Sequence, residues 1–110
     1  MIDWTRIADL RLEIGNDSFA EVVDLFLEET DEVVLRLVPG KAMHLLADDL
    51  HFLKGSALNL GFSDLALLCA DGEREANLGG GGVIDLPGVV RSYQASKAAF
   101  LDGLSEAAAA

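Results

Sequence analysis

Apolar residues recur at steps of three and four positions over most of this 110-residue chain, and that spacing places them on one face of an α-helix. The longest run has its inward positions at Phe19, Val22, Val23, Phe26, Thr30, Val33, Val34 and Leu37. The acidic residues that fall mainly on the opposite, solvated face are Asp24, Glu28, Glu29, Asp31 and Glu32. No stretch shows the sustained alternation that marks a strand. The pattern predicts an all-α protein.

Capping residues and turns divide the apolar pattern into a short first helix and four longer ones. The short first helix is expected from the cap Asp3 to a stop at Gly15-Asn16, and the second from a capping box at Ser18–Glu21 to Pro39-Gly40. The third is expected from Ala42 to Leu60, and the fourth from its cap Ser63 to Asn77. A Gly-rich connector at 79–82 then leads to the last helix, which Asp85 caps. Four substantial helices joined by short turns predict an antiparallel up-down-up-down four-helix bundle with a short extra N-terminal helix. We expect one domain over residues 1–110.

The third predicted helix carries one of the two histidines of the chain on its exposed side. Its buried stripe is expected to consist of Met43, Leu46, Ala47, Leu50, Leu53, Ala57 and Leu60. At about 100° per residue, His51 lies roughly 120° from the middle of this stripe. The residues that share its sector are His44, Asp48, Gly55 and Leu58. His51 is therefore a poor candidate for a core histidine.

The neighbours of His51 on this helix suggest a site for an anion. Lys54 and Gly55 stand three and four residues on, which makes them its immediate neighbours on the helix surface. A glycine inside a helix costs about 1 kcal/mol relative to alanine, and room for a large partner would offset that cost. An approachable histidine beside a positive charge suits a group that accepts an anion and hands it on.

The fourth predicted helix supplies candidate partners for this histidine. A short turn at Gly61-Phe62 makes the third and fourth helices antiparallel, so residues equally far from the turn lie at similar height. Glu73 and Arg74 are then the polar residues opposite His51. A carboxylate that accepts the proton of one ring nitrogen fixes the tautomer and makes the other nitrogen a better nucleophile. The spacing is equally compatible with Glu73 as an ordinary surface residue.

The formal net charge of −11 narrows the range of partners. It argues against nucleic acid and anionic membrane surfaces, because both would repel the domain. No apolar run is long enough to span a bilayer, and the opening residues contain no basic segment that would begin a secretory signal. The single cysteine, Cys69, rules out an internal disulfide and fits a reducing cytoplasm. We therefore expect a cytoplasmic protein that binds neither nucleic acid nor membrane.

The third and fourth predicted helices share a specific run of residues. It reads His51-x-Leu53-Lys54-Gly55-Ser56-Ala57-x-x-x-Gly61, followed by Leu65, Leu68-Cys69 and Glu73. This run closely resembles the histidine-containing phosphotransfer (HPt) domains of multistep phosphorelays, and the resemblance extends over nearly the whole chain. It implies that His51 is phosphorylated, that Lys54 helps to hold the phosphoryl group or to receive the acidic partner, and that Glu73 bonds the histidine ring. Further candidates for access and docking are Gly55, Ser56, Leu58, Asp48 and Arg74.

The resemblance also implies a mechanism and a set of partners. The chain would be a covalent phosphoryl carrier that exchanges the group with the aspartates of response-regulator receiver domains or of a hybrid histidine kinase. No cofactor of its own is expected, since the receiver would bring Mg²⁺ with its aspartyl phosphate. Nothing resembles an ATP-binding kinase domain, and we expect a monomer. Two departures from the family are Gly72, where a bulky apolar residue, commonly leucine, is usual, and a short turn between the second and third helices. We expect the glycine to loosen the packing under Glu73.

Two other functions compete with this interpretation. His44, Asp48 and His51 stand at i, i+4 and i+7 and could bind a transition metal weakly on one helix face. That hypothesis leaves Lys54 unexplained, because an ammonium group beside a metal cation is unfavourable. The second alternative is a non-covalent docking module that sequesters response regulators, which predicts tight binding with no phosphate on His51.

Overall fold

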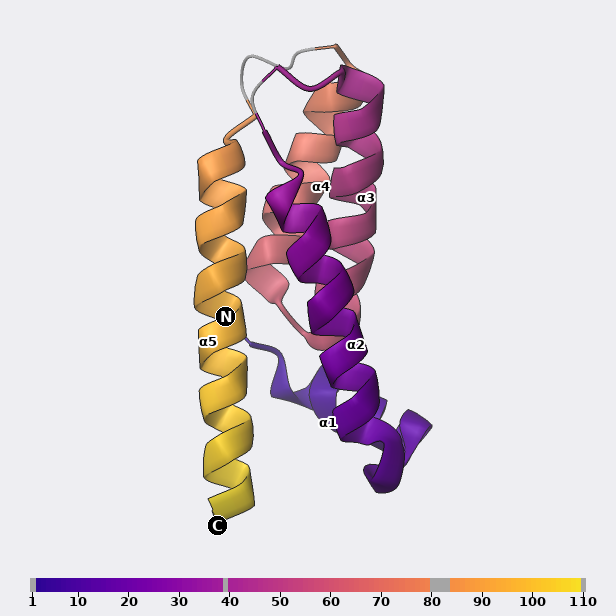
Figure 1. Cartoon of the computed structure of the whole chain (residues 1–110), viewed down its shortest axis with the longest axis vertical. Coiled ribbons are helices and arrows are strands. Elements are labelled where there is room, and N and C mark those ends of the chain that lie inside the picture. Colours follow the sequence, from indigo (N-terminus) through magenta and orange to yellow (C-terminus); the bar gives the residue numbers. More distant parts are fainter. Residues whose placement is uncertain (1, 39, 80–83, 110) are drawn as a thin grey trace.

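A computed structural model describes residues 2–38, 40–79 and 84–109 of the chain. Within these ranges the backbone forms five helices and no strand, and their bounds are α1 Trp4–Ile14, α2 Asn16–Leu35, α3 Met43–Leu60, α4 Ser63–Asn77 and α5 Leu86–Ala109 (Figure 1). The prediction of an all-α protein is confirmed. Most of the Gly-rich connector expected before the last helix lies outside the described residues.

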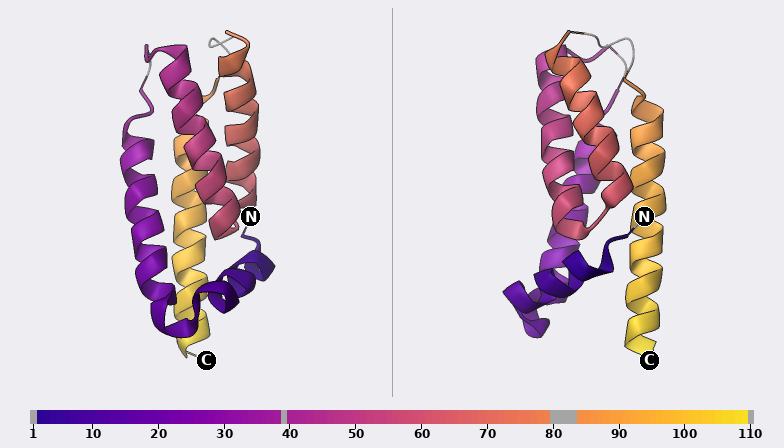
Figure 2. Two further views of the ribbon diagram at one scale, coloured as in Figure 1. Left: turned by 90° about the vertical axis from the view of Figure 1, so that its right-hand side faces the viewer. Right: turned by 180° about the vertical axis from the view of Figure 1, so that it is seen from behind.

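The four longer helices lie along one axis of an elongated molecule measuring 47 × 21 × 21 Å. Successive long helices run in opposite directions, and α1 lies across the end of the bundle where α3 meets α4 (Figures 1 and 2). The helices α3 and α4 form the closest pair. In the described ranges, no helix has both the length and the apolar character needed to cross a membrane.

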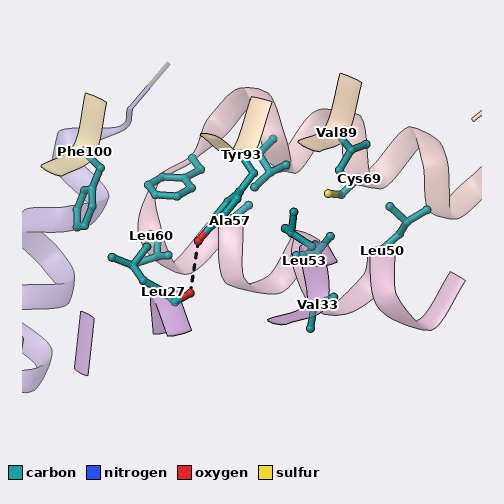
Figure 3. Close-up of a cluster of buried hydrophobic side chains, with 14 of the residues drawn as sticks. Leu27, Val33, Leu50, Leu53, Ala57, Leu60, Cys69, Val89, Tyr93 and Phe100 are labelled. Atoms are coloured by element: carbon teal, nitrogen blue, oxygen red, sulfur yellow. Dashed lines mark hydrogen bonds between the residues drawn. The ribbon is translucent and has the colours of Figure 1, made fainter. Parts of the chain in front are cut away.

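Apolar faces of the long helices meet in one core. Figure 3 shows Val33 of α2 beside Leu53 of α3, with Cys69 of α4 on the other side, and Leu27 of α2 beside Leu60 of α3 and Tyr93 of α5. The predicted stripe of α3 is buried from Leu46 to Leu60, and Met43 packs against it as a partly buried residue. Burial of each such leucine stabilises the fold by about 1.5–3 kcal/mol. The core therefore fixes which face of α3 remains at the surface.

Two of the expected helix caps are confirmed and two are wrong. The side chain of Asp3 accepts a hydrogen bond from the backbone of Arg6, and that of Asp85 accepts one from the backbone of Gly88. The helix α2 begins two residues before Ser18, directly after Gly15 with its positive φ of 93°, so Ser18 lies inside the helix. Ser63 is the first helical residue of α4 and its side chain makes no cap.

The turn between α3 and α4 is held by the N-terminal segment. Gly61 adopts the left-handed conformation with φ of 71°, which is unfavourable for residues with a Cβ. The backbone N–H of Asp3 donates to the carbonyl of Gly61 at 2.7 Å, and a Cβ at Gly61 would lie 2.6 Å from the Asp3 carbonyl oxygen. This close approach requires glycine and sets the register of α3 against α4.

The connector between α2 and α3 differs from its expected length. The helix α2 ends at Leu35, so the link covers residues 36–42 rather than a short turn at Pro39-Gly40. Lys41 forms an ion pair with Asp49 of α3 and also donates to the carbonyl of Arg36. These contacts tie Arg36 and Lys41 of the connector to each other and to α3, whereas Pro39 of the expected turn lies outside the described residues.

One residue of the acidic run on α2 has a structural role. Asp31 accepts hydrogen bonds from the hydroxyl of Tyr93 and the ammonium of Lys97, both on α5. Burial raises the pKa of Asp31, but the hydrogen bonds from Tyr93 and Lys97 and the charge of Lys97 outweigh it and hold that pKa below its usual value. Asp31 therefore links α2 to α5, and only the rest of the run fits the expected solvated face.

Candidate phosphoryl-accepting site

His51 lies halfway along α3 on its exposed side, and α4 supplies its polar partner. The Nδ1 atom of His51 is 2.8 Å from Oε2 of Glu73. The side chain of His51 is 70% exposed, whereas that of Glu73 is only 18% exposed. The structure thus brings Glu73 opposite His51, where the register argument expects it. Its role in chemistry remains a prediction.

Glu73 also binds the cation of the predicted site. Lys54 donates from Nζ to Oε1 of Glu73 at 2.6 Å, so the two carboxylate oxygens hold two different partners. This hydrogen bond from Lys54 is the main reason that the pKa of Glu73 lies below its usual value; burial opposes it, and the hydrogen bond from His51 lowers it further. Glu73 is therefore ionised at neutral pH.

The ionised carboxylate determines the tautomer of the neutral imidazole. A carboxylate without a proton can only accept hydrogen bonds, so Nδ1 of His51 must carry the proton and donate it to Glu73. The lone pair of the neutral ring then resides on Nε2. Because the ring is held at one edge and largely exposed, Nε2 is available to an approaching electrophile.

The helix position of Gly55, one turn after His51, faces open space; that this space admits a partner stays a prediction. A Cβ built on Gly55 would meet no heavy atom within 4 Å. Leu58, seven residues after His51 and hence on the same side of the helix, is 59% exposed. Along α3 after His51, the exposed surface therefore has open space at Gly55 and an exposed apolar side chain at Leu58.

Ser56 does not belong to this surface. It is buried, with 9% exposure, although it was expected among the access and docking residues. The physical reason is helical geometry: five residues at about 100° each rotate Ser56 roughly 140° away from His51. It therefore contributes to packing inside the bundle.

The remaining predicted docking residues lie around the site without touching the imidazole. Asp48 is exposed about one turn before His51. Arg74 lies next to Glu73 but forms an ion pair with Asp71 at 2.9 Å. Together with Lys54 and Glu73, Arg74 lines an open surface hollow of about 360 Å³. This hollow continues the site from α3 onto the end of α4.

The helix position beneath Glu73 is packed more tightly than the sequence predicts. Glycine replaces the usual leucine at Gly72, and looser packing was expected there. However, a Cβ at Gly72 would lie 3.0 Å from Cδ1 of Leu50 and 3.5 Å from Cγ2 of Ile84. The expectation of loose packing is wrong, because side chains from α3 and from the residues before α5 occupy the space.

Two other chemistries receive no support at this surface. Among residues 2–38, 40–79 and 84–109, no group of three or more His, Cys, Asp or Glu side chains is arranged to hold a metal ion. The alternative metal site at His44, Asp48 and His51 therefore lacks its ligand geometry. Burial raises the pKa of Cys69 to about 12, so this thiol stays protonated and unreactive.

The fold and the site define a helical bundle with an exposed, carboxylate-oriented histidine. A family model, that of the Hpt domain, matches residues 21–109. The chain therefore belongs to the Hpt domain family, whose members carry phosphoryl groups on a histidine in phosphorelays and are carriers rather than kinases. No curated protein and no solved structure matches the chain significantly. The family match begins within α2, so it does not include α1.

A graded series at Gly55 tests whether open space is what this residue provides. We expect Gly55→Ala to stabilise the protein by up to about 1 kcal/mol, since the added Cβ meets nothing, and to leave phosphoryl transfer within a few-fold of wild type. Gly55→Gln should fold equally well but slow transfer on the order of a hundredfold, because its long side chain keeps the partner from the in-line position. Chemical denaturation and transfer kinetics measure the two effects, and equal rates for all three proteins would contradict the role.

Proposed function

We propose that this chain is an antiparallel four-helix phosphotransfer domain in which Nε2 of His51 accepts a phosphoryl group from a receiver aspartyl phosphate and passes it to another receiver aspartate. The observation that carries this proposal is the contact between Nδ1 of His51 and Oε2 of Glu73 at 2.8 Å. It leaves the opposite ring nitrogen as the nucleophile. The open surface at Gly55 supplies the approach.

The transfer step needs positioning and charge compensation more than covalent assistance. Phosphoryl transfer passes through a loose transition state with the attacking and leaving groups in line. The imidazole meets the first requirement because Glu73 fixes its orientation. Lys54 meets the second, since its ammonium is paired with the same carboxylate as His51 and so places a positive charge beside the site where the phosphoryl oxygens arrive. We therefore assign His51 as the carrier and Lys54 and Glu73 as its supports.

The proposed partners are receiver domains of response regulators, of a hybrid histidine kinase, or of both. A receiver would bring its own aspartyl phosphate and the Mg²⁺ that neutralises it. Leu58, Gly55 and Asp48 form the part of α3 around His51 on which such a domain would dock. We propose that the chain acts as a monomer in the cytoplasm, without ATP-dependent activity of its own.

A transfer assay tests this proposal directly. The chain is mixed with a set of phosphorylated receiver domains, and the products are separated and tested for acid lability. A phosphate that is acid-labile, stable to base and located on His51 by mass spectrometry is the expected result. Receivers that bind tightly but leave no phosphate on the chain would instead establish a sequestering module.

A further inference from the structure

The proton on Nδ1 of His51 matters after phosphorylation as well as before it. We infer that Glu73 keeps this proton in place once Nε2 carries the phosphoryl group, so that phosphorylated His51 is held as a phosphoimidazolium, the form that gives the group away readily. This role of Glu73 rests on the proposed function and extends it. It would make the chain a good donor as well as an acceptor.

The geometry allows the contact to survive phosphorylation. Oε2 of Glu73 binds Nδ1 at 2.8 Å, and Nε2 lies on the far side of the five-membered ring. A phosphoryl group on Nε2 therefore does not displace Glu73. The side chain of Glu73 is 18% exposed against 70% for His51, so solvent competes for the carboxylate less than for the ring. Lys54 holds the other carboxylate oxygen at 2.6 Å and prevents it from rotating away.

The chemistry balances without moving a proton. In the first step the Nε2 lone pair forms the phosphorus–nitrogen bond, the phosphorus–oxygen bond of the aspartyl phosphate breaks, and its electron pair leaves with the aspartate carboxylate. The ring keeps its Nδ1 proton and gains a positive charge beside the negative Glu73. In the second step the phosphorus–nitrogen bond breaks and its electron pair returns to Nε2. The leaving group is then neutral imidazole.

Loss of the Nδ1 proton between the two steps would change the leaving group. A neutral phosphoimidazole would have to depart as an imidazolide anion or wait for a proton, and both routes are slower. An opposite charge within hydrogen-bond distance favours the protonated, cationic ring. Glu73 supplies that charge, and the low pKa of Glu73 means that it does so throughout the neutral and mildly acidic range.

Other charged groups near His51 modify this effect but do not replace it. The charged or titratable residues of α3 and α4 around it are His44, Asp48, Lys54, Asp71, Glu73 and Arg74. Lys54 opposes ring protonation, but its ammonium is paired with Glu73. Arg74 is paired with Asp71. From α1 and the α2–α3 connector, Arg6 bonds Asn59, and Arg36 and Lys41 bond Asp49. Glu73 is the carboxylate that touches the ring.

The first test measures the proton directly. The protein is phosphorylated with phosphoramidate in a His44→Gln background, so that a single phosphohistidine forms, and nitrogen-15 and phosphorus-31 NMR follow Nδ1 as the pH is raised. Glu73→Gln keeps an acceptor of the same shape but removes the charge. We expect the midpoint of Nδ1 deprotonation to fall by at least about one pH unit in Glu73→Gln, a tenfold loss of proton affinity. Glu75→Gln, on the same helix about 200° away, is the matched control and should leave the midpoint unchanged.

The second test follows the same proteins as phosphoryl donors to a receiver domain between about pH 6 and pH 9. The rate should decline as the pH is raised in all three proteins, and the decline should begin at a lower pH in Glu73→Gln than in wild type and Glu75→Gln. Identical midpoints, or equal shifts in both variants, would overturn the inference. Failure of the proposed function would give a different result. Receiver domains would then neither give a phosphoryl group to the chain nor take one from it, whatever residue stands at position 73, and the inferred donor role of the chain would also be wrong.

Discussion

Replacing His51 with glutamine is expected to abolish phosphate uptake from receiver domains while leaving the fold intact. Glutamine has no nucleophilic ring nitrogen, so no phosphorus–nitrogen bond can form. The side chain of His51 is 70% exposed and its main polar contact is Glu73, so its loss should change the free energy of unfolding by no more than about 1 kcal/mol. Radiolabel transfer and thermal unfolding measure these two quantities.

The second histidine provides the matched control for this experiment. His44 lies on the same exposed side of α3, two turns before His51, and His44→Gln should accept phosphate at the wild-type rate. Phosphate that persists in His51→Gln and disappears in His44→Gln would transfer the carrier role to the other histidine. Uptake that is lost in both variants would indicate that the surface of α3 is needed for docking and would leave the identity of the acceptor to mass spectrometry.

Helical periodicity and turn geometry predicted the main features of the fold and the site. The apolar stripe of α3 determined which side of the helix His51 occupies, because burying that stripe leaves only one exposed sector. The short turn at Gly61 determined the register of α4 against α3, and this register was enough to place Glu73 opposite His51. Both inferences depend on local rules, namely the angle per residue and the antiparallel register after a short turn.

The sequence did not predict features that depend on contacts between distant segments. Ser63 resembles a helix cap, but the hydrogen bond from Asp3 to the Gly61 carbonyl fixes the preceding turn instead. Lys54 is expected to hold the phosphoryl group or to receive the acidic partner, and that role stays a prediction. Only the structure shows that the carboxylate of Glu73 binds Lys54 as well as His51. Asp31 belonged to an acidic run, and its bond to Tyr93 joins residues far apart in the chain.

Gly72 is the clearest case of such a distant contact, and it leads to a prediction with a large effect on stability. Leu50 is fully buried, and its Cδ1 atom lies 3.0 Å from the position of a Cβ at Gly72. Leu50→Ala alone should destabilise the protein by about 2–5 kcal/mol, since it opens a cavity. Gly72→Leu alone should destabilise it by about 1–3 kcal/mol through overpacking. Urea unfolding of the two variants would measure both changes in the free energy of unfolding.

The double variant Leu50→Ala with Gly72→Leu should be more stable than the sum of the two single effects implies, by at least about 1 kcal/mol. The leucine introduced at position 72 then enters the volume that the side chain of Leu50 has left. Leu60→Ala is the matched control: it is also a buried leucine of α3, but it lies about 15 Å along the helix from Leu50. Its effect should simply add to that of Gly72→Leu, and a coupling as large as that of Leu50 would show that the two side chains do not share one space. Because Gly72 directly precedes Glu73, the double variant should also recover transfer activity to the extent that it recovers stability.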